Sequence, residues 1–106
     1  DLANALVYLA TLDDERYNIL VEPSQCPLVN VGSGTDLTIR ELAETVAEVV
    51  GYAGTFVQDT SKPDGTPRKL MDVARLNEMG WKARTGLKGG LNTAYADFLA
   101  YLEAEK

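Results

Sequence analysis

A helix whose two ends are both marked lies in the middle of the chain, and it constrains the fold more than any other segment. Thr38 followed three positions later by Glu41 forms the capping-box pattern that begins a helix, and Gly51 is placed to end it. Apolar residues recur between these ends at helical spacing: Ile39, Leu42, Ala43, Val46, Val49 and Val50. The pattern predicts an amphipathic helix over residues 38–50 that must bury one face against another element.

Short apolar runs on either side of this helix predict two strands. The first covers residues 28–31 and is closed by the glycine-containing turn 32–34, and the second covers residues 55–57. A strand, a helix and a strand in this order favour parallel pairing with a right-handed crossover.

Helices are predicted for much of the remaining chain. They cover residues 2–11, residues 73–79 with Asp72 as cap and Gly80 as stop, and a final segment that begins near Thr85. Residues 12–28 are predicted to form a connection with room for a short turn of helix. The predicted fold class is therefore α/β, helix-rich with two short parallel strands, in a single domain over residues 1–106.

Charge is unevenly distributed along this acidic chain, whose net charge is −6. Residues 62–88 hold seven basic and three acidic residues, whereas the remainder holds three basic and thirteen acidic ones. The overall negative charge argues against nucleic acid as a partner. The locally basic segment can still bind a small anion, because charges act over about a Debye length of ~8–10 Å.

Composition also limits the chemistry and the compartment. Cys26 is the only cysteine, which excludes an internal disulfide and favours a reducing cytoplasm. Histidine is absent, which removes the commonest general base and the usual zinc ligand, and we predict no metal site. No apolar run approaches the roughly 20 residues needed to cross a bilayer, so we predict no membrane contact.

Two motifs of nucleotide-dependent reductases are incomplete in this chain. The turn at residues 32–34 lacks the third glycine of a dinucleotide fingerprint because Leu37 stands in its place, so a tight turn is favoured over phosphate binding. None of the five tyrosines is followed four residues later by the lysine that lowers the pKa of a catalytic tyrosine. We therefore predict no catalytic residue and no cofactor-binding residue here.

The loop over residues 59–72 is the segment best suited to ligand binding. Two prolines stiffen it, and a stiff loop loses less entropy when it closes on a ligand. Arg68 offers a planar fork suited to a diphosphate, Lys69 adds a mobile positive charge, and Asp64 can accept hydrogen bonds from sugar hydroxyls. On these residues alone, a solvated charged loop with an ordinary Pro-Asp-Gly turn is slightly favoured.

The same loop carries a family resemblance. The chain resembles the C-terminal part of the GDP-L-fucose synthases, a family of extended short-chain dehydrogenases, in the run Lys-Pro-Asp-Gly-Thr-Pro-Arg-Lys-Leu-Met-Asp-Val at residues 62–73. Residues 29–34 and 38–42 and the Gly80-Trp81 pair continue the likeness, which is weakest over residues 11–27.

The resemblance implies the substrate-binding lobe of an NADPH-dependent epimerase and reductase that acts on GDP-4-keto-6-deoxy-D-mannose. In the family, the positions of Asp64 and Lys69 help to hold the nucleotide-sugar, and we add Arg68 from its place between them. The resemblance further implies that NADPH and the catalytic residues belong to an N-terminal Rossmann domain absent from this chain. The isolated chain should then be inactive, and the whole enzyme should be a cytoplasmic homodimer.

A free-standing acidic module for protein interaction is the competing hypothesis. The acidic balance outside residues 62–88 favours it, whereas an opening segment that reads as a helix already under way favours a piece of a longer enzyme.

Overall fold

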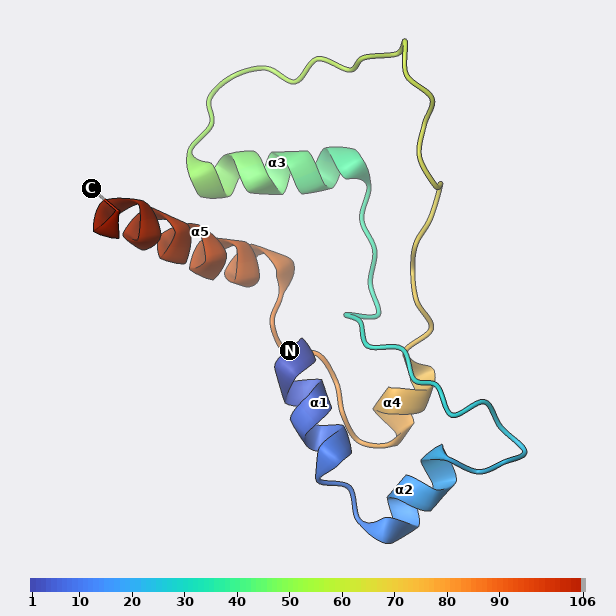
Figure 1. The fold of residues 1–106 in the computed structure, drawn as a ribbon. Coiled ribbons are helices and arrows are strands. Elements are labelled where there is room, and N and C mark those ends of the chain that lie inside the picture. Colours follow the sequence, from blue (N-terminus) through green and yellow to red (C-terminus); the bar gives the residue numbers. More distant parts are fainter. Residues whose placement is uncertain (106) are drawn as a thin grey trace. The chain divides into compact units, whose positions relative to one another are not determined.

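The computed structural model describes residues 1–105, which form five helices joined by irregular segments (Figure 1). The helices are α1 (Leu2–Ala10), α2 (Asp14–Leu20), α3 (Ile39–Val50), α4 (Ala74–Glu78) and α5 (Leu87–Ala104). The chain divides into two compact units, which are described separately below. Unit 1 comprises residues 1–35 and 70–84, and unit 2 comprises residues 36–69 and 85–105.

A small apolar core holds unit 1 together. Ala5 of α1, Leu76 of α4 and Trp81 are buried, with exposed fractions of 0%, 1% and 6%. Trp81 Nε1 donates a hydrogen bond to Asn4 Oδ1 at 2.8 Å, so the polar edge of the indole is satisfied as the ring enters the core. Four half-buried side chains complete the cluster: Tyr8, Leu9, Val31 and Ala83.

One guanidinium fastens the end of α2 and the irregular segment that follows it, up to residue 28, to α4. Arg75 donates hydrogen bonds to the carbonyl oxygens of Leu20 at 2.9 Å, Leu28 at 2.9 Å and Cys26 at 2.5 Å. Charge-assisted bonds of this kind satisfy backbone acceptors that no helix or strand supplies with a donor. The segment is therefore ordered by a side chain rather than by a backbone ladder.

The predicted α/β class with two parallel strands is wrong, because residues 1–105 contain no strand. Residues 28–31 belong to unit 1 and residues 55–57 to unit 2, so neither unit holds both extended runs. In unit 1 Arg75 binds the carbonyl of Leu28, as described above. In unit 2 Val57 is 90% exposed and lacks the half-buried surface on which a strand depends.

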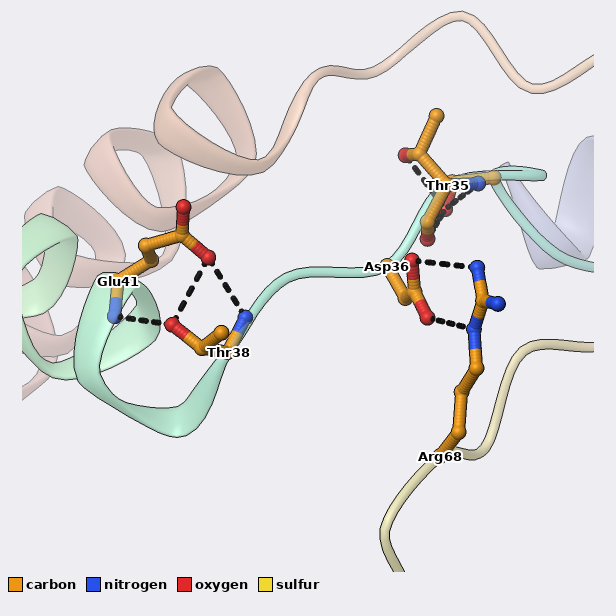
Figure 2. Close-up of polar contacts among 6 residues, drawn as sticks. Thr35, Asp36, Thr38, Glu41 and Arg68 are labelled. Atoms are coloured by element: carbon orange, nitrogen blue, oxygen red, sulfur yellow. Dashed lines mark hydrogen bonds and ion pairs between the residues drawn. The ribbon is translucent and has the colours of Figure 1, made fainter.

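The first element predicted from the sequence, the helix over residues 38–50, is confirmed as α3 of unit 2. Thr38 Oγ1 accepts from Glu41 N at 3.1 Å, while Glu41 Oε2 accepts from Thr38 N at 2.7 Å (Figure 2). Gly51 ends the helix in the left-handed conformation, with φ 72°. Helix α3 packs against α5, and Lys88 Nζ lies 2.5 Å from Glu48 Oε1 between them (Figure 1).

The shorter helices depart from their predicted bounds by a few residues. Residues 12–28, predicted as a connection, contain the seven-residue helix α2, which is capped by Asp13 because its side chain accepts from Arg16 N at 2.8 Å. The cap predicted at Asp72 is at Val73, although Asp72 Oδ1 accepts from Ala74 N at 2.9 Å. Asp72 therefore satisfies one of the first donors of α4 from just outside the helix.

Removal of the Leu76 side chain is expected to destabilise unit 1. Leu76→Ala deletes a side chain that is 1% exposed, and the lost burial together with the cavity left behind should cost about 2–3 kcal/mol. Urea denaturation followed by far-ultraviolet circular dichroism measures the loss. Leu6→Ala, in a side chain that is 59% exposed, is the matched control, and an equal loss in both variants would contradict the assignment of the core.

The capping box predicts a defined pH dependence for α3. The hydrogen bond from the backbone N–H of Thr38 lowers the pKa of Glu41 below its ordinary value of 4.5. The folded pKa is thus below the unfolded one, so the stabilisation is complete above pH 4.5 and is lost as pH falls through the folded pKa. Acid titration of helical ellipticity should show this loss, and Glu41→Gln should flatten it. An unchanged titration in Glu41→Gln would contradict the prediction.

Candidate functional site

The loop over residues 59–69 lines a cavity of about 670 Å³ in unit 2. Residues 64–69 contribute to its lining from the loop, and residues 36–39 contribute from the segment that leads into α3. The three residues predicted to bind substrate are all on this lining: Asp64, Arg68 and Lys69. The three residues share this cavity because they are close in sequence and belong to one loop.

Arg68 is paired with an acidic residue on the opposite segment of the lining (Figure 2). Its Nε lies 2.5 Å from Asp36 Oδ2, and its Nη2 lies 3.3 Å from Asp36 Oδ1. The hydrogen bond from Arg68 lowers the pKa of Asp36 below its ordinary value of 3.8, and the same bond raises the pKa of Arg68. Because the side chains are 67% and 38% exposed, water and salt screen this ion pair strongly.

Lys69 and Asp64 differ from Arg68 in having no polar partner within residues 1–105. Neither side chain forms a hydrogen bond or an ion pair with another residue in the described range 1–105, and both residues are exposed. A mobile ammonium and a carboxylate on the wall of one cavity can meet a ligand without first breaking a bond inside the protein.

A turn fixes the point at which this loop leaves the preceding segment. Asp59 Oδ1 accepts hydrogen bonds from Ser61 Oγ at 2.6 Å and from Ser61 N at 3.0 Å. The hydroxyl of Ser61 lowers the pKa of Asp59. Beyond this turn lies a second cavity of unit 2, about 620 Å³, whose lining includes Phe56, Lys62 and Asp64. Asp64 therefore borders both cavities.

The lining of the first cavity offers both donors and acceptors to a polar ligand. The charged side chains of the first cavity are two acids, Asp36 and Asp64, and two bases, Arg68 and Lys69. Such a lining can donate to phosphate oxygens and accept from hydroxyls. Within residues 1–105 no group of three or more Cys, Asp or Glu side chains could hold a metal ion. Nor does any helix of that range have the length and apolar character needed to span a membrane.

The turn at residues 32–34 contains a glycine in the left-handed conformation. Gly34 has φ 76°, and a Cβ added there would lie 3.1 Å from Val73, so the turn is packed against its own unit. No strand of the described chain leads into it, and α3 begins only at Ile39. We assign no cofactor to this turn.

Asp36 was missed in the sequence analysis although it is the partner of Arg68. The two residues are 32 positions apart, and no periodicity links an acid before a helix to a base late in a loop. Its place just before the capping box was visible, but the chain holds sixteen acidic residues that compete for such a pairing. Only the folded backbone selects this one.

Comparison with known proteins identifies relatives over almost the whole chain, although no protein-family model matches it. GDP-L-fucose synthase of Escherichia coli K12 is 50% identical over 101 residues, which cover 93% of this chain and 30% of that protein. Probable GDP-L-fucose synthase 1 of rice is 52% identical over 95 residues, covering 90% of this chain and 26% of its own length. Putative GDP-L-fucose synthase 2 of Arabidopsis thaliana is 47% identical over 106 residues, covering 100% and 29%.

These relatives agree in name and in extent. The chain spans about 30% of the length of the curated relatives it matches. Identity near one half over about a hundred residues reflects common descent rather than a shared composition. The chain is therefore homologous, over most of its length, to one portion of the GDP-L-fucose synthases.

Proposed function

We propose that this chain is the nucleotide-sugar-binding part of an enzyme like GDP-L-fucose synthase. In this proposal the whole protein epimerises GDP-4-keto-6-deoxy-D-mannose and then reduces it with NADPH, and residues 1–106 form its substrate-binding lobe. The observation that carries the proposal is the convergence of Asp64, Arg68 and Lys69 on one cavity, in a chain about half identical to proteins of that name.

Each of the three residues has a role that follows from its chemistry. The guanidinium of Arg68 presents a planar set of donors to the diphosphate. Lys69 adds a positive charge on a flexible side chain, which can adjust to the position of the bound phosphate. Asp64 accepts hydrogen bonds from hydroxyls of the ribose or the sugar. Of the two cations on this lining, Arg68 is paired with Asp36, whereas Lys69 has no side-chain partner within residues 1–105 to release.

The chemical steps belong to residues outside this chain in our proposal. NADPH supplies the hydride when it is bound, and we place it with the catalytic groups on a Rossmann domain that forms a cytoplasmic homodimer. The present residues bind and orient the substrate. The cavity and the charged loop support the binding role of the present residues.

Loss of either cation from the loop is expected to weaken binding of GDP. Lys69→Ala and Arg68→Ala should each raise the Kd roughly tenfold, because each removes a charge-assisted contact to the diphosphate. Isothermal titration of the chain with GDP at low salt measures the change.

Lys82→Ala provides the control for this titration, because it removes the same charge from an exposed residue of unit 1. A Kd that is the same in Lys69→Ala, Arg68→Ala and Lys82→Ala would refute the proposed site.

A further inference from the structure

The ion pair between Asp36 and Arg68 joins the two segments that line the cavity of about 670 Å³. Asp36 belongs to the segment before α3, and Arg68 belongs to the loop, 32 positions later. Both are in unit 2, and Figure 2 shows the guanidinium reaching across to the carboxylate. The contact therefore restrains the side chain of Arg68 and links the two segments to each other.

The pairing engages the guanidinium through two different nitrogens. A guanidinium has five N–H groups, and the two bonds to Asp36 use Nε and one N–H of Nη2. The remaining donors, on Nη1 and Nη2, are not used by the carboxylate. Two parallel contacts fix both the position and the plane of the group, which a single contact would not do.

Asp36 has two opposing effects on an anion that approaches Arg68. Its negative charge repels the anion, while its hold on Arg68 removes rotamer freedom that the arginine would otherwise lose on binding. The repulsion is weakened because the carboxylate is 38% exposed and already compensated by the guanidinium. The balance of these two effects decides whether Asp36 strengthens or weakens binding of the anion.

We propose that Asp36 is a positioning residue that holds Arg68 with its remaining N–H groups available to a nucleotide diphosphate. This inference rests on the proposed function, since it needs the cavity to bind such a ligand. It assigns to Asp36 a role that acts through Arg68 and involves no contact with the ligand.

A double-mutant cycle on GDP binding tests the inference. Asp36→Asn keeps the shape of the side chain but turns one acceptor into a donor facing the guanidinium, and Asp36→Ala removes both acceptors. We expect Asp36→Asn to raise the Kd for GDP roughly threefold and Asp36→Ala roughly fivefold, a coupling typical of residues in contact. In an Arg68→Ala background both substitutions should leave the Kd unchanged, because there is no longer a guanidinium to orient.

Glu48→Gln is the matched control, because it breaks a different ion pair of unit 2, with Lys88, whose residues do not line the cavity. It should bind GDP like the unsubstituted chain. Circular dichroism of each variant establishes that α3 and α5 are intact.

The outcomes separate this inference from the function on which it rests. Absence of GDP binding by the unsubstituted chain would overturn both. A weaker Kd in Arg68→Ala with an unaltered or tighter Kd in Asp36→Asn and Asp36→Ala would retain the site and overturn the role of Asp36. An effect of Asp36→Ala that persists in the Arg68→Ala background would do the same, because Asp36 would then act independently of Arg68.

Discussion

The packing of Leu76 and Trp81 around Ala5 is the contact on which the structure of unit 1 depends. Helix α1 has nine residues and α4 has five, lengths at which an isolated helix is not stable in water. Their stability must come from the face that each buries. The fully buried position in α1 is an alanine, whose small side chain lets the indole and the leucine approach the helix closely.

Two arginines order irregular segments in different ways, and the difference bears on function. Arg75 donates three of its five N–H groups to neutral carbonyl oxygens, so most of its donors serve the backbone of unit 1. Arg68 binds one carboxylate, so its charge is balanced while part of its donor set stays unused. The first arrangement stabilises a fold, whereas the second suits a residue that must exchange or share its partner.

The helices could be predicted from local sequence patterns, whereas the conformation of the short apolar runs between them could not. The cap at Thr38 and the stop at Gly51 directly adjoin the helix that they bound. One short stretch of sequence therefore specifies where this helix begins and ends. A strand requires a partner elsewhere in the chain, and the apolar runs at residues 28–31 and 55–57 do not supply one to each other.

The same distinction applies to the candidate site. Asp64, Arg68 and Lys69 share one loop, but their chemistry alone slightly favoured a solvated loop, and it was the family resemblance that selected them as candidate binding residues. The pairing of Arg68 with Asp36 depends on how the backbone brings distant segments together, which periodicity does not encode.

The position of the single tryptophan makes the two units spectroscopically distinct. Trp81 lies in the core of unit 1, and unit 2 contains only tyrosine and phenylalanine as aromatic residues. Fluorescence excited selectively in the indole therefore reports on unit 1 alone, whereas far-ultraviolet circular dichroism reports on the helices of both units. Comparing the two signals during denaturation distinguishes a chain that melts as one cooperative body from one whose halves open in separate steps.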